Sequence, residues 1–152
     1  MKAQTFQYLT EWTTLFHNNM AELMEQGLAR QDNERAKWLL EYVIDHERKL
    51  AKEVEGFKQQ ADPKALNTWL YDQISETLPP DQRTREIDYG KMTFDQICEE
   101  IFDVHNQVME IWKGMTSKGA IPEAKELAQK IYDLEKHETL RLADQITSSR
   151  DM

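Results

Sequence analysis

The chain has 152 residues, of which 39% are hydrophobic, and this length fits one ordinary domain over 1–152. Its formal net charge of −9, without a basic cluster, argues against nucleic acid and anionic membranes as partners, because Lys and Arg must neutralise phosphates there. The sequence has no run near the ~20 apolar residues of a spanning helix, no apolar signal-peptide stretch and one cysteine. These features predict a soluble, cytoplasmic protein without an internal disulfide, in which Cys98 is a buried thiol.

Four long segments place apolar residues at i, i+3, i+4 and i+7, which is the period of an amphipathic helix. These segments are about 5–28, 33–58, 94–117 and 122–147. Their starts carry recognisable signals: Asp32 is an N-cap type, Thr93 and Gln96 form a capping-box pair, and Pro122 suits a first helical turn. Each helix would be ~35 Å long, and the short links within the first and last pairs predict two antiparallel hairpins.

The segment 59–92 separates the two predicted hairpins. Asp62 followed by proline predicts the start of a short helix of about 63–77, and a polar loop of about 81–92 follows. A connection this long can run the full length of a bundle, so the chain need not reverse at the end where it left. We therefore predict an all-α fold, a four-helix bundle with a long crossover between its second and third long helices.

All four histidines lie near the midpoints of four different predicted helices. They are His17, His46, His105 and His137. In a bundle of equal helices the midpoints share one layer, so these side chains should converge. Glu47 and Glu138 lie near the centres of two of the apolar faces, beside His46 and His137. We expect the inner positions to be His17, Glu47, His105 and Glu138, with His46 and His137 as further ligands or supporting groups.

Carboxylates in the middle of a core stay ionised only if a positive charge compensates them. A divalent metal ion would supply that charge, and a set of imidazole and carboxylate ligands suits iron, manganese or zinc, of which iron is our first choice. A metal-free network in which histidine and glutamate satisfy each other is the alternative. Three of the tryptophans, Trp12, Trp38 and Trp112, are interpreted as core or inter-helix packing rather than as a redox chain.

The helix lengths, the crossover and the two mid-helix glutamates resemble the ferritin-like superfamily, in particular its rubrerythrin-type domains. Those domains hold two iron ions with one glutamate from each of two helices and a Glu-x-x-His motif from each of the other two. Glu47 and Glu138 match the glutamates of these motifs, whereas Leu50 and Arg141 stand where the motifs have histidine. The resemblance implies iron with oxygen or peroxide chemistry, although the ligand set departs from the standard one.

Histidines on all four helices also resemble hemerythrin-like cation-binding domains. In the ferritin-like comparison, His17 and His105 take the places of glutamates, whereas in the hemerythrin-like comparison they match histidines. The sequence thus leaves three functions open: a ferritin-like metal-binding protein, a helical interaction module with a buried polar network, and a hemerythrin-like oxygen- or iron-binding domain. A symmetric homodimer is plausible on general grounds.

Overall fold

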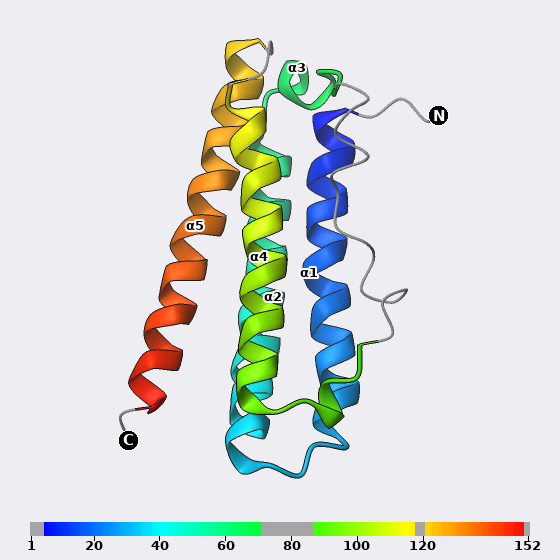
Figure 1. Ribbon diagram of the computed structural model, residues 1–152. Coiled ribbons are helices and arrows are strands. Elements are labelled where there is room, and N and C mark those ends of the chain that lie inside the picture. Colours follow the sequence, from blue (N-terminus) through cyan, green and yellow to red (C-terminus); the bar gives the residue numbers. More distant parts are fainter. Residues whose placement is uncertain (1–4, 71–86, 118–120, 151–152) are drawn as a thin grey trace.

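The computed structural model describes residues 5–70, 87–117 and 121–150, and within these residues the protein is all-helical (Figure 1). It has four long helices, and their positions match the four predicted segments. They are α1 (Phe6–Leu28), α2 (Glu34–Gln60), α4 (Phe94–Met115) and α5 (Pro122–Arg150). A one-turn helix, α3 (Pro63–Leu66), follows α2, and a 3₁₀ turn, η3 (Tyr89–Lys91), precedes α4.

The helix starts follow the capping rules, with one correction. The side chain of Thr93 accepts from the backbone N–H of Gln96 and the Gln96 side chain accepts in return, which confirms the predicted capping box. The N-cap of α2, however, is Asn33 and not Asp32. Asn33 has the extended backbone typical of an N-cap, and its backbone N–H donates to Gln31 Oε1. The N-cap of α2 therefore lies one residue later than predicted.

The connection between α2 and α4 begins and ends at opposite ends of α1. The backbone of Phe6 donates to Thr68 O at 3.0 Å at the start of α1, whereas Arg30, just beyond its end, pairs with Asp88 at 2.6 Å. Since 23 residues of α-helix extend about 35 Å, the two described ends of the connection lie about one helix length apart, as the predicted crossover requires. Consequently α2 and α4 run in the same direction, whereas α1 and α5 run in the opposite one (Figure 1).

The short helix of this connection is shorter than predicted. It begins at Pro63 with Asp62 as its N-cap, as the sequence indicates, but it ends at Leu66. The Asn67 backbone then closes the turn on Pro63 O, and the chain continues in a non-helical path beside the start of α1. The rest of the predicted helix, residues 71–77, and the first part of the predicted loop, residues 81–86, lie outside the described residues.

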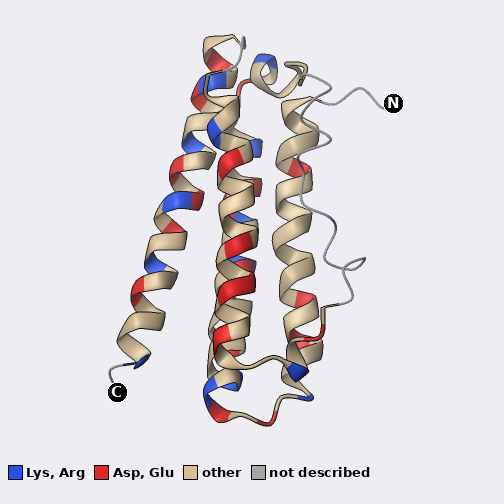
Figure 2. Cartoon of the chain, in the orientation of Figure 1, with Lys and Arg blue, Asp and Glu red and all other residues tan. Residues whose placement is uncertain are grey.

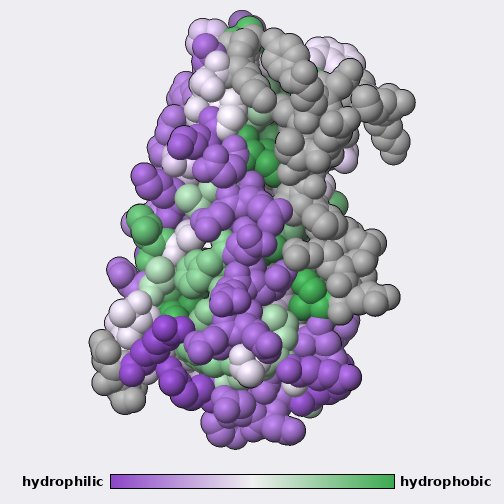
Figure 3. Space-filling model, in the orientation of Figure 1, coloured by the Kyte–Doolittle hydropathy of each residue, from purple (hydrophilic) through white to green (hydrophobic). Residues whose placement is uncertain are grey.

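Apolar side chains from all four long helices form one core. Charged residues occur along the long helices (Figure 2), and on the face seen in Figure 3 hydrophilic residues cover much of the described surface, with hydrophobic patches between them. Cys98 is buried, as predicted. Trp112 is fully buried and donates its indole N–H to Thr13 Oγ1 at 3.1 Å, whereas Trp38 is 38% exposed and lies outside the core. Among the described helices, none combines the length and the apolar character that crossing a membrane would require.

Candidate metal centre

Four polar side chains, one from each long helix, meet at mid-height of the core. They are His17 of α1, Glu47 of α2, His105 of α4 and Glu135 of α5, and all four are completely buried. Each occupies a position on the inward face of its helix, with apolar residues one turn before or after it. The helical period that buries those apolar residues therefore forces the polar side chains inward as well.

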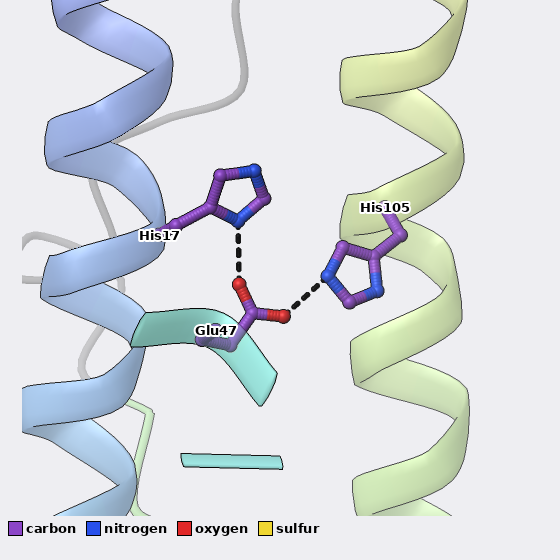
Figure 4. Close-up of side chains that lie close together, drawn as sticks. All are labelled: His17, Glu47 and His105. Carbon is purple, nitrogen blue, oxygen red and sulfur yellow. Dashed lines mark hydrogen bonds and ion pairs between the residues drawn. The ribbon is translucent and has the colours of Figure 1, made fainter. Parts of the chain in front are cut away.

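The Glu47 carboxylate lies between two imidazoles (Figure 4). Its Oε2 is 2.5 Å from His17 Nδ1, and its Oε1 bonds His105 Nε2. The second nitrogen of His17, Nε2, is 2.6 Å from Glu135 Oε1. The result is a continuous chain of contacts, Glu135–His17–Glu47–His105, that joins all four long helices through side chains.

Opposite charges compensate each other along this chain. Burial by itself lowers the pKa of His17, but the carboxylates of Glu135 and Glu47 outweigh burial and raise that pKa to about 10. Burial likewise raises the pKa of Glu47, yet the imidazoles of His105 and His17 hold it well below its usual range. In the metal-free protein His17 is thus a cation between two buried carboxyl groups.

Three buried atoms in this region have no hydrogen-bond partner among the described residues. They are His105 Nδ1, Glu135 Oε2 and Nε2 of the neighbouring His46. The His46 ring is only 8% exposed and meets the His105 ring edge-on, with 6.2 Å between centroids. Burial is the largest influence on His46 and lowers its pKa, which favours the neutral imidazole that metal ions bind. These two nitrogens and one oxygen make no hydrogen bond within the described residues, and each is an atom type that can bind a metal ion.

Three of the four central residues could hold a single metal ion. One ligand atom each from His17, Glu47 and His105 can be chosen so that all lie within 4.8 Å of one another. Ligand atoms about 2.1 Å from a metal at angles of about 90–110° are separated by about 3.0–3.4 Å. The 2.5 Å contact between His17 and Glu47 would thus open by about half an ångström or more as a metal ion replaced the shared proton.

The predicted site residues fall into three groups. His17, Glu47 and His105 come together as expected. Glu138 and His46 lie beside them, with 3.7 Å between His46 Nδ1 and Glu138 Oε2, and Glu138 is partly accessible to solvent.

His137 does not join the group, because its side chain is exposed on the outside of α5. Sequence reasoning missed Glu135, although a signal was present. Glu135 lies four residues after Ile131 and seven before Leu142, two buried residues of the same stripe, so its position on the apolar face matches that of Glu138.

Comparisons with protein-family models, with curated proteins and with solved structures gave no match. The structure by itself defines the class of protein: an all-helical protein of four long helices with a buried group of histidine and glutamate. That group could hold a metal ion.

Proposed function

We propose that the protein binds a divalent metal ion in the middle of a ferritin-like four-helix bundle, with His17, Glu47 and His105 as ligands and Glu135 as an additional carboxylate. The observation that carries this proposal is the cluster itself, in which ligand atoms from three helices lie within 4.8 Å of one another without exposure to solvent. Buried carboxylates and imidazoles together suit iron, zinc or manganese, and iron is the ion we propose.

The helix arrangement supports the ferritin-like part of the proposal. The parallel course of α2 and α4, separated by a connection along the bundle, is the arrangement that a ferritin-like bundle requires. The hemerythrin-like alternative has less support, because the exposed His137 leaves α5 without an inward histidine. Oxygen or peroxide chemistry at the ion is proposed only by analogy of fold.

A metal-free polar network is the second candidate, and one observation favours it. Both nitrogens of His17 already contact carboxylate oxygens, so this imidazole is satisfied without an ion. In that case the four residues would fix the register of the helices, and the protein would act as a helical interaction module.

Metal content separates the two candidates. Protein produced in medium supplemented with iron, manganese or zinc should contain one of these metals in stoichiometric amount, and the double variant Glu47→Gln/His105→Gln should lose it. The matched control is Glu41→Gln/His137→Gln, which makes the same two chemical changes at exposed positions of α2 and α5. If the double site variant keeps its helical circular dichroism and an undiminished metal content, metal binding at this site is refuted.

A further inference from the structure

A ladder of aromatic rings runs along α2 from the surface to the candidate metal centre. Trp38, Tyr42 and His46 are four residues apart and therefore share one face of the helix. Trp38 stacks on Tyr42 with 5.7 Å between centroids and 16° between planes, and Tyr42 stacks on His46 at 6.3 Å and 22°. His46 then meets His105 at 6.2 Å, and His105 bonds Glu47.

The two ends of this ladder lie in opposite surroundings. Trp38 is 38% exposed, Tyr42 is half-buried and His46 is 8% exposed, so burial increases step by step toward the centre. Burial of apolar surface explains an inward tryptophan, but Trp38 is one of the exposed large hydrophobic residues of the described chain. What distinguishes its position is the unbroken line of ring contacts that leads from it to the buried group.

A second line of rings, on α1, provides an internal comparison. Trp12 stacks on Phe16 at 5.3 Å, and Phe16 meets His17 at 5.6 Å. The geometry is as close as on α2, but a phenyl ring is much harder to oxidise than an indole or a phenol. Of these two lines, only the one on α2 has two neighbouring rings, those of Trp38 and Tyr42, that can give up one electron and recover it.

We propose that Trp38 and Tyr42 carry single electrons from a reductant at the surface, past His46, to a redox-active metal ion at His17, Glu47 and His105. The inference rests on the proposed metal site. It adds a partner class, a one-electron donor that acts at the exposed Trp38. It also revises the sequence-based view of Trp38 as a packing residue.

The chemistry balances with iron(II) as the resident ion and hydrogen peroxide as the oxidant. Cleavage of the O–O bond to give two water molecules consumes two electrons. Tyr42 supplies one of them, losing the proton of its hydroxyl to become a neutral phenoxyl radical, and an iron(II) ion held by His17, Glu47 and His105 would supply the other as it is oxidised to iron(III). Two protons are taken up by the peroxide oxygens, one from Tyr42 and one from solvent. The surface donor then returns two electrons one at a time through Trp38: the first, with a proton from solvent, restores Tyr42, and the second would return the ion to iron(II).

The alternative is that the stacked rings only stabilise the helix, since neighbouring aromatic side chains attract each other at this spacing. Conservative substitutions separate the two roles. Tyr42→Phe keeps the ring and its stacking but raises the potential for oxidation, and Trp38→Phe does the same at the surface. Trp12→Phe is the matched control on α1, where Phe16 already interrupts the line.

The first experiment uses the full chain loaded with iron(II) and mixed with hydrogen peroxide, followed by freeze-quench electron paramagnetic resonance. We expect a tyrosyl radical that Tyr42→Phe abolishes, with iron content unchanged. We also expect ascorbate to quench this radical more slowly in Trp38→Phe than in the unmodified protein or in Trp12→Phe. A tyrosyl radical that survives Tyr42→Phe, or the absence of any radical from iron-loaded protein, would overturn the inference.

The second experiment needs no metal and so separates the ladder from the metal site. Azide radicals generated by pulse radiolysis oxidise exposed tryptophans, and electron transfer from tyrosine to tryptophan is followed as decay of the tryptophanyl band and growth of the tyrosyl band. Tyr42→Phe and Trp38→Phe should each reduce the concentration-independent part of this transfer, whereas Trp12→Phe should not. If the protein binds no iron, the proposed function fails, and this measurement alone decides whether electrons pass between Trp38 and Tyr42. If neither variant changes the rate or the amount of this transfer, electron transfer between Trp38 and Tyr42 is refuted.

Discussion

Replacing Glu47 by glutamine tests whether the centre binds metal through its most connected side chain. The change keeps the shape of the residue and leaves it able to donate and accept hydrogen bonds, but it removes the charge that contacts both His17 and His105. A bound metal ion loses a charged ligand, so its affinity should fall sharply. The metal-free protein keeps a filled, hydrogen-bonded core.

The size of the effect follows from linkage between binding and folding. Loss of a residue that only supports a ligand weakens metal binding about 10- to 100-fold, so we take about 100-fold as a minimum for a direct ligand. Metal at about 1,000 times its Kd stabilises the folded protein by about 4.1 kcal/mol, and a 100-fold weaker site leaves about 1.4 kcal/mol. At about 2–4 °C per kcal/mol, the metal-induced rise in Tm should shrink from about 8–16 °C to about 3–6 °C.

The assay is thermal unfolding followed by circular dichroism, with and without iron(II) under anaerobic conditions, on the unmodified protein and the variant. Glu41→Gln removes the same charge from an exposed position of α2 and should leave the metal-induced shift unchanged. An equal metal-induced rise in Tm for Glu47→Gln and Glu41→Gln would show that Glu47 is no ligand. The absence of any rise in the unmodified protein would support the metal-free network instead.

Further predictions concern the proton on His17 and the close packing at the end of α1. Because the pKa of metal-free His17 is about 10, metal must displace its proton, and the affinity should rise about tenfold per pH unit between pH 6 and 8 in chelator competition. For the metal-free protein the raised pKa stabilises the fold fully below about pH 6.5, so Tm should decline as pH rises toward 10, and a flat profile would contradict this. A Cβ at Gly27 would lie 2.6 Å from Tyr89 Cβ, so Gly27→Ala should cost about 1–3 kcal/mol in urea unfolding. Nothing lies within 4 Å of a Cβ at Gly56, so Gly56→Ala should instead stabilise the fold by up to about 1 kcal/mol, and similar effects of both changes would refute this steric reading.

The long helices could be predicted because their determinants are local. The capping box at Thr93, the proline at 122 and the apolar period lie within each segment, and the observed starts agree within a residue or two. The end of α3 could not be predicted this way. The chain leaves the helix after Leu66 and pairs instead with the start of α1, where the Phe6 backbone donates to Thr68, and this contact joins residues far apart in the sequence.

The sequence predicted three of the four central residues of the site, but it did not predict Glu135. His17, Glu47 and His105 follow from the position of polar residues on apolar faces at mid-helix. Which glutamate of α5 points inward depends on the rotation of that helix. Glu135 and Glu138 lie three residues apart and thus about 60° apart around the helix, and packing places Glu135 in the core and Glu138 at its edge.

Unpartnered atoms in the buried polar layer favour the proposed metal site over a structural network alone. A buried network is stabilising only when every member is satisfied, yet His105 Nδ1 and Glu135 Oε2 have no partner among the described residues. An apolar layer of the same volume would stabilise the helices without these losses. A cation that replaces the His17 proton would draw on the same imidazoles and carboxylates and could recruit Glu135, so the features that weaken the metal-free core are those that a bound ion would use.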